Sequence, residues 1–190
     1  MKLDYLENVI EQFKYYKLLA DNTFSQLTDE QLFWQFNQES NSIAIIVNHL
    51  SGNMLSRWTD FLNSDGEKDW RNRDSEFENK IQNRKELIIK WNEGWECLIN
   101  SLKSLSEEDL TKIIYIRNEG HTVIEAINRQ LTHYPYHVGQ IVYLGKILCG
   151  SKWKSLSIPK GKTKEYNKSK FDKPKKKRNF KAEFLNDNDE

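Results

Sequence analysis

The stretch TVIEAINRQLTHYPYHVGQI, residues 122–141, carries the strongest structural signal in this 190-residue chain. Its apolar residues recur at intervals of three and four, a spacing that places them on one face of an α-helix. They are Ile124, Ile127, Leu131, Tyr134, Val138 and Ile141. The stretch begins with Thr122 and has Glu125 three positions later, which is a capping box that starts a helix. We therefore predict one long helix that packs in a bundle.

Pro135 lies in the middle of this repeat and could interrupt the helix, because proline lacks a backbone N–H and crowds the preceding turn. The apolar repeat nevertheless continues from Leu131 to Val138 without a change of phase. We expect a single kinked helix in which the carbonyl of Leu131 has no helical partner.

Similar apolar patterns predict three further long helices, at about residues 2–24, from Ser42 through Phe61, and from Phe77 to Leu102. A capping box at residues 28–31 and an acidic start at residues 106–109 each predict a short helical turn. Residues 113–120 alone resemble strands, and they could form a small hairpin or an extended connection. The predicted fold class is therefore all-α, a four-helix bundle with short connecting helices. The small hairpin before the last helix is one of the two options for residues 113–120.

Composition separates a folded body from a tail. Residues 159–190 carry a net charge of +5 and few apolar residues, whereas residues 1–158 carry −4. We expect residues 1–158 to form the bundle and residues 159–190 to be a flexible basic tail. An acidic body argues against a nucleic-acid groove. Nucleic-acid association through residues 160–181 is the weaker alternative, because lysine-rich tails commonly serve solubility and this one ends in acidic residues.

The sequence contains neither a signal-peptide pattern nor an apolar run long enough for a membrane span. Cys97 and Cys149 have no paired spacing, so we expect both to be reduced. These observations predict a cytoplasmic protein with no membrane partner.

Two of the four histidines, His133 and His137, lie in the quoted stretch at positions i and i+4. On a helix this spacing stacks both imidazoles on one face, away from the polar stripe that contains Glu125 and Arg129. His49 lies in another apolar helix. Three neutral histidines can bind one divalent metal and leave a coordination position open, as in catalytic zinc sites. The alternative is three histidines that are satisfied within the core.

Four other polar residues are candidates for the lining of a pocket beside such a metal. Gln130 and Gln140 share the inward face of the last helix, while Asn53 and Arg57 continue the face of His49. Buried polar groups need partners, whether a metal, water or one another. The alternative is a hydrogen-bonded interior or an exposed helix edge. None of the four is a good general base, so the catalytic residues beyond the metal ligands are unknown.

Two segments together resemble the DinB-like superfamily, which includes bacterial damage-inducible proteins and bacillithiol-type thiol S-transferases. They are Asn41-Ser-Ile-Ala-Ile-Ile-Val-Asn-His49-Leu and the His133-x-x-x-His137-x-Gly-Gln140 pattern, in an order of elements that matches across about residues 3–150. The segments 118–126 and 153–159 are similar to an uncharacterised bacterial branch. The resemblance implies a four-helix bundle, a nickel or zinc ion on the three histidines, and a homodimer.

Two functions remain open at this stage. The first is a metal-dependent enzyme that acts on a small-molecule substrate, either by thiol transfer to an electrophile, as the resemblance implies, or by hydrolysis. The second is a non-catalytic metal-binding or ligand-binding bundle, for example a stress-response protein. An aspartate, glutamate or cysteine in the fourth coordination position would favour this second function, because it would indicate a structural metal.

Overall fold

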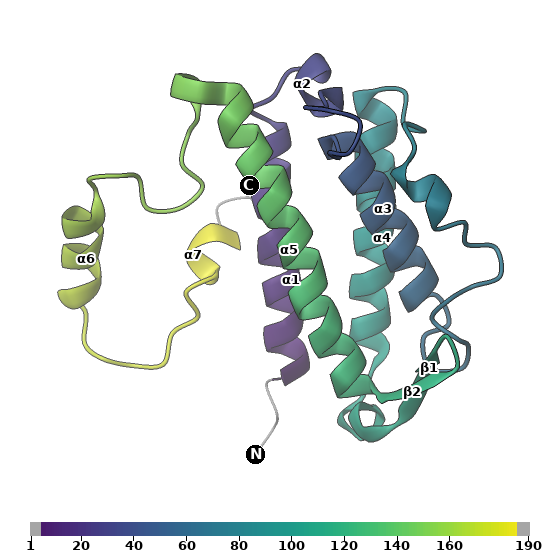
Figure 1. Ribbon diagram of the computed structural model, residues 1–190. Helices are drawn as coiled ribbons and strands as arrows, with labels where there is room; N and C mark the ends of the chain where they lie inside the picture. Colours follow the sequence, from purple (N-terminus) through teal and green to yellow (C-terminus); the bar gives the residue numbers. More distant parts are fainter. Residues whose placement is uncertain (1–4, 186–190) are drawn as a thin grey trace.

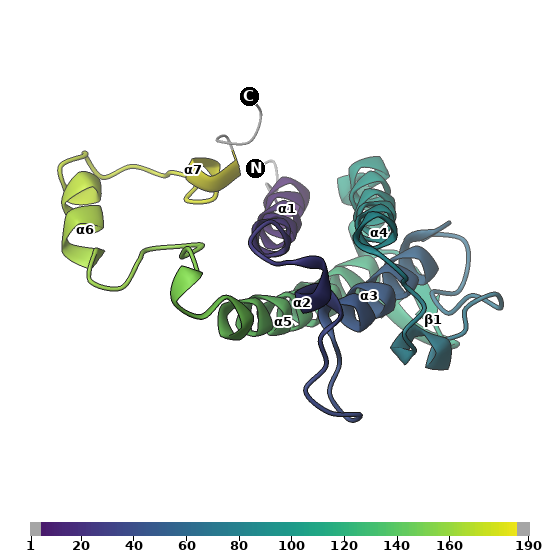
Figure 2. The same ribbon diagram turned by 90° about the horizontal axis from the view of Figure 1, so that it is seen from above.

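The structure, a computed structural model, describes residues 5–185, and the protein is mostly helical (Figure 1). Four long helices lie side by side, with α1 and α4 in one layer and α3 and α5 in the other (Figure 2). Their bounds are α1 Tyr5–Phe24, α3 Ile43–Trp58, α4 Arg84–Ser104 and α5 Val123–Cys149. Contacts join α3 to α4, α1 to α5, α1 to α4, and α3 to α5, so the four helices enclose one core.

The centre of the core is aromatic. The rings of Phe13, Trp95 and Tyr134, from α1, α4 and α5, lie 5.8–6.2 Å apart between centroids. The buried hydroxyl of Tyr134 donates a hydrogen bond to Asn53 Oδ1 at 3.0 Å and accepts one from Trp58 Nε1 at 3.0 Å. Both partners are on α3, so this hydroxyl joins α3 and α5 through a satisfied buried polar group.

The predicted capping residues begin the helices as expected. The Ser42 hydroxyl accepts a hydrogen bond from the Ile45 N–H and caps α3, while Thr122 caps α5. Thr28 caps the short helix α2 (Asp29–Phe33), and a 3-10 helix, η2 (Glu107–Thr111), follows Ser106. Helix α5 runs through Pro135 without interruption, as the phase of its apolar repeat predicts.

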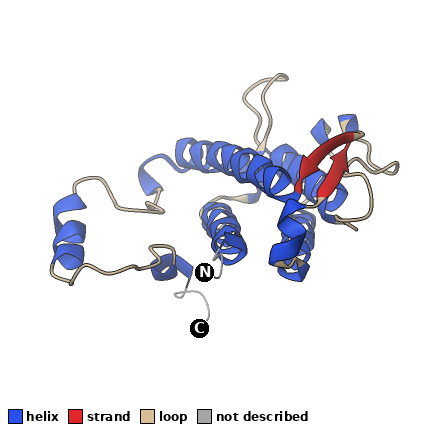
Figure 3. Cartoon of the chain, turned by 90° about the horizontal axis from the view of Figure 1, so that it is seen from below, coloured by secondary structure: helices blue, strands red, loops and turns tan. Residues whose placement is uncertain are grey.

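The segment before α5 is a β-hairpin (Figure 3). Strands β1 (Ile113–Ile116) and β2 (Glu119–Thr122) pair antiparallel around a two-residue turn. Arg117 and Asn118 in the turn have φ angles of 57° and 61°, the left-handed conformation that two-residue hairpin turns require. Asp65 Oδ1 and Oδ2 accept hydrogen bonds from the N–H groups of these two residues at 2.8 Å. The strand-like residues therefore form a hairpin, which was one of the two predicted options, rather than an extended connection.

Two predicted helix boundaries were wrong. Helix α4 begins at Arg84 rather than Phe77, because Asn83 is its N-cap, and α3 ends at Trp58 rather than Phe61. Phe77 instead ends the 3-10 helix η1 (Asp74–Phe77), and Ile81 is buried in the connection that follows. Apolar side chains in a connection that packs on the core can continue the spacing of a helix. Spacing alone therefore placed the start of α4 too early.

After α5 the chain forms a 3-10 turn, η3 (Gly150–Lys152), and then helices α6 (Thr163–Phe171) and α7 (Ala182–Leu185). Helix α7 lies against α1. Lys181 is buried there, with its Nζ 3.3 Å from the carbonyl oxygen of Asn8 and 3.6 Å from Glu11 Oε2. The division at residue 159 and the flexibility of the tail stay predictions. None of the described helices has both the length and the apolar character that a membrane crossing requires.

Candidate metal centre

The structure brings together His49 of α3 and the pair His133 and His137 of α5. One ring nitrogen of each lies within 4.8 Å of the others. The Nε2 atoms of His49 and His133 are 3.4 Å apart. Two imidazole nitrogens bound at 2.0–2.1 Å to a tetrahedral ion lie about 3.3 Å apart, so this separation fits one shared metal. Among residues 5–185, no aspartate, glutamate or cysteine joins the three histidines in this group.

A buried carboxylate orients the first of these rings. Glu76, in η1, accepts a hydrogen bond from His49 Nδ1 at 2.9 Å. Arg71 holds the same carboxylate through two hydrogen bonds, Nε to Oε1 at 2.7 Å and Nη2 to Oε2 at 3.0 Å. The proton on Nδ1 leaves the Nε2 lone pair of His49 facing the other histidines, which is the tautomer that a metal needs.

The pKa of Glu76 reflects these contacts. Burial raises it, but the hydrogen bonds from His49 and Arg71 and the positive charge of Arg71 outweigh burial and hold the pKa below its ordinary value. The carboxylate is therefore ionised at neutral pH. Gly52 makes room for it, because a Cβ at this position would lie 2.5 Å from Glu76 Oε1.

Two glutamine side chains on α5 orient the other two rings. Gln130 Oε1 lies 3.0 Å from His133 Nδ1, and Gln140 Oε1 lies 2.8 Å from His137 Nδ1. Each amide oxygen accepts the Nδ1 proton of a histidine three positions away, one turn of helix. All three imidazoles therefore have an acceptor at Nδ1, and Nε2 is left as the ligand atom of each.

Burial keeps the α5 histidines uncharged. The pKa of His133 falls to about 3, first because the ring is removed from water and then because His137 and His49 are close. Burial also lowers the pKa of His137, against a smaller opposite effect of its hydrogen bond with Gln140. Neutral imidazole is the form that binds metal, so both rings are ready as ligands at neutral pH.

The three histidines line a cavity of about 480 Å³. Phe77 forms one wall and stacks on His49, with ring centroids 4.7 Å apart and planes 26° from parallel. The described lining contains no aspartate or glutamate but has five arginines. These arginines are Arg57, Arg71, Arg73, Arg117 and Arg129.

The four pocket candidates from the sequence have different positions. Asn53, Arg57 and Gln130 line the cavity, and Asn53 also accepts the Tyr134 hydrogen bond. Gln140 is outside the lining and contacts the site through His137. His121, the fourth histidine, lies in β2 and outside the histidine group.

Sequence reasoning missed Glu76 and Arg71. Both lie in a polar connection with several other acids and bases, in a part of the chain where no periodic pattern assigns a side chain to the interior. Asn48, beside His49, fixes this connection by donating a hydrogen bond to the carbonyl oxygen of Glu76 at 2.9 Å. Only the folded arrangement identifies the Glu76 carboxylate as the partner of His49.

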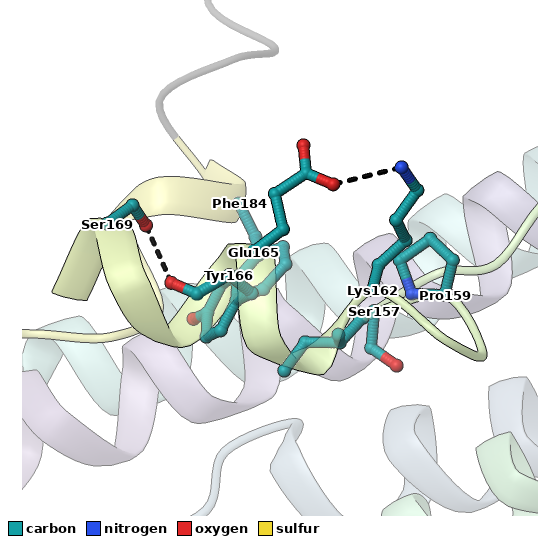
Figure 4. Close-up of a pocket in the computed structure, with 8 residues that line it drawn as sticks. Ser157, Pro159, Lys162, Glu165, Tyr166, Ser169 and Phe184 are labelled. Atoms are coloured by element: carbon teal, nitrogen blue, oxygen red, sulfur yellow. Dashed lines mark hydrogen bonds and ion pairs between the residues drawn. The ribbon is translucent and has the colours of Figure 1, made fainter. Parts of the chain in front are cut away.

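A second cavity, of about 440 Å³, lies in the C-terminal region (Figure 4). Side chains of α6, the preceding loop and α7 line it, among them Tyr166 and Phe184. Figure 4 marks two polar contacts of the lining, the ion pair of Lys162 with Glu165 at 2.9 Å and the hydrogen bond that Ser169 donates to the Tyr166 carbonyl. Within residues 5–185, the lining includes a single carboxylate and neither histidine nor cysteine, so this described part lacks the ligands of a transition-metal site.

Comparison with known proteins gave one family. The sequence profile of the family described as "Protein of unknown function (DUF1572)" matches residues 1–162, which include all four long helices and the three histidines. A search of curated proteins found no match.

Proposed function

The chain belongs to the family described as protein of unknown function (DUF1572), and we propose that it is a metal-dependent enzyme. In this proposal His49, His133 and His137 hold one divalent ion and leave a coordination position open to the adjoining cavity. The observation that carries the proposal is the convergence of three ring nitrogens within 4.8 Å. The hydrogen-bond acceptor at each Nδ1 supports it, because metal-binding histidines usually have such a partner.

The sequence resemblance to the DinB-like superfamily supports the same proposal, with a four-helix bundle and nickel or zinc as the metal. Imidazole ligands suit both ions. The absence of a carboxylate or cysteine from the described group favours a reactive site over a structural one, since structural zinc is usually four-coordinate with protein ligands.

A divalent ion held there would supply a Lewis acid that favours the ionised form of a thiol or a water molecule. The chain's own contribution is orientation and charge. Glu76, Gln130 and Gln140 fix the three rings, and the described lining of the cavity provides no carboxylate to act as a general base. A nucleophile that ionises readily suits such a site, because a thiol has a pKa near 8.5 and needs little help from a base. We therefore propose thiol transfer to an electrophile as the reaction, with hydrolysis as the alternative.

Elemental analysis of protein purified without a histidine tag tests the metal. The proposal expects about one nickel or zinc per chain, or its restoration by titration after stripping. His137→Ala should lose the metal while the bundle stays folded, and His121→Ala should keep it, because His121 is outside the group. Metal that cannot be restored would overturn the proposal.

A panel of thiols with electrophiles, and of activated esters, tests catalysis. Rates should require the metal-loaded protein and fall to background in the stripped protein and in His137→Ala. Equal rates with and without metal would leave the non-catalytic metal-binding bundle as the function. The homodimer that the resemblance implies also stays a proposal, and the exposed Tyr136, Tyr143 and Ile147 side chains on α5 support it as a contact surface.

A further inference from the structure

Arg57 is a buried cation without a hydrogen-bond partner at two of its nitrogens. The residue lies on α3 with 7% of its surface exposed, and it lines the cavity beside the histidines. Its Nε and Nη1 atoms are buried and donate no hydrogen bond within the described part of the chain. Buried donors of a charged group that form no hydrogen bond are costly, so their position at a cavity wall points to a ligand that accepts from them.

The carboxylate that forms an ion pair with Arg57 does not fill this role. Glu67 Oε2 is 3.9 Å from Arg57 Nη1, too far for a hydrogen bond. The same oxygen already accepts from Arg71 at 3.1 Å and lies 3.2 Å from Nη2 of Arg117. Glu76, a buried acid that also pairs with Arg71, is engaged by His49 and Arg71. Five arginines therefore line the cavity, and the carboxylates that pair with them are those of Glu67 and Glu76, which are outside the lining.

The outer part of the cavity is also cationic. Arg73 and Arg129 are exposed, and neither forms an ion pair with an acid between residues 5 and 185. The Arg73 guanidinium lies over the Phe77 ring, 5.1 Å from its centroid, and Phe77 stacks on His49. A cavity wall of one charge attracts and concentrates molecules of the opposite charge.

We propose that this cavity is an oxyanion subsite that binds a carboxylate or phosphate group of the substrate, with Arg57 as its buried anchor. The planar guanidinium fork matches the paired oxygens of both groups. This inference rests on the proposed function in that the anchored molecule is the substrate of the metal centre. The histidines line the same cavity, so an anion held by Arg57 has the rest of its structure beside the metal position.

The test is isothermal titration calorimetry of the metal-free protein at low ionic strength. The probes are inorganic phosphate and, in a separate arm, succinate. We expect saturable binding of one probe molecule per chain, weakened at least tenfold in Arg57→Met. This variant should fold, because it replaces a buried cation with two unsatisfied nitrogens by an apolar side chain of similar length. Arg129→Gln, at an exposed position, should weaken binding several-fold.

Lys103→Gln is the matched control, since it removes one exposed positive charge from α4, outside the cavity. Binding should be unchanged in it. No saturable binding of either probe, undiminished binding in Arg57→Met, or an equal loss in the Lys103 control would each overturn the subsite. Binding of only one probe assigns the anionic group as carboxylate or phosphate.

Nickel titration of the same proteins separates this inference from the proposed function. Arg57→Met should bind nickel as tightly as the unchanged protein, because Arg57 is not in the histidine group. Nickel binding without anion binding would overturn the subsite and leave the metal centre. Anion binding without nickel binding would overturn the metal centre and with it the assignment of the anion as its substrate.

Discussion

Glu76 Oε2 lies 2.9 Å from His49 Nδ1 and joins a carboxylate of η1 to a histidine of α3 across 27 residues of sequence. Because Arg71 holds the other side of this carboxylate, the His49 ring has one orientation and one tautomer.

Glu76→Gln should reduce the affinity for nickel or zinc by about 10- to 100-fold, the usual cost of losing a partner of a metal-binding histidine. The amide is neutral, so it no longer stabilises the partial positive charge of a coordinated His49. Competition titration with a chelator measures the affinity. Glu78→Gln is the control, because Glu78 is an exposed acid in the same connection. An unchanged affinity in Glu76→Gln would show that the carboxylate does not support the ligand.

Gly52→Ala should lower metal affinity about tenfold by moving the same carboxylate. The added Cβ would meet Glu76 Oε1 at 2.5 Å and Cδ at 2.8 Å, and three hydrogen bonds keep that side chain from moving freely. Gly139→Ala provides the control, because nothing lies within 4 Å of its Cβ position. There the alanine should stabilise α5 by about 0.5–1 kcal/mol, through helix propensity, without a change in affinity. Equal metal affinities in the two variants would contradict the steric argument.

Tyr134→Phe should lower the free energy of unfolding by about 1–3 kcal/mol, the cost of leaving buried polar groups unsatisfied. The change removes the hydroxyl that accepts from Trp58 and donates to Asn53. Urea denaturation measures the loss. Tyr136→Phe is the control, because Tyr136 is 63% exposed and should change stability little. A loss of the same size in both variants would mean that the hydroxyl does not join α3 to α5.

The sequence predicted the helical content, the capping residues at positions 28, 42 and 122, and the continuity of α5 through Pro135. These features depend on short-range spacing and on local hydrogen bonds, which one sequence contains. The predicted start of α4 was wrong because Phe77 and Ile81 are apolar for a reason other than the face of a helix. Phe77 stacks on His49 and Ile81 enters the core, and neither requires a helix.

The same difference, between features set by short-range spacing and features set by long-range packing, applies to the candidate site. The His133 and His137 pair follows from the period of one helix, and the inward face of α3 makes His49 a candidate. The orientation of the His49 ring depends on a carboxylate in an aperiodic connection, which the sequence does not assign to any face. The proposed oxyanion subsite also depends on residues outside the long helices, since Arg117 of the hairpin and Arg73 of the connection before α4 line the cavity. Long-range packing, rather than spacing, brings these groups together.

Asp65→Asn should lower the free energy of unfolding at pH 7 by about 1–3 kcal/mol, because the carboxylate accepts three backbone hydrogen bonds and an amide has only one accepting atom. The donors are the N–H groups of Glu67, Arg117 and Asn118, at 2.7–2.8 Å. Arg117 and Asn118 form the left-handed turn of the hairpin, so the change should act on the hairpin first.

The same substitution has a defined pH dependence. Burial raises the pKa of Asp65, but hydrogen bonds from the backbone N–H groups of Asn118, Glu67 and Arg117 outweigh it and lower the pKa overall. A carboxyl group whose pKa is lower in the folded state stabilises the fold above its unfolded pKa, about 4, and loses this effect as pH falls through the folded value. The stability difference between the unchanged protein and Asp65→Asn should therefore be full at pH 7 and shrink below about pH 4. Urea denaturation at pH 7, 4 and 3 measures it, with the exposed Asp69→Asn as control. A difference that stays constant over this range would mean that the ionised carboxylate does not stabilise the hairpin.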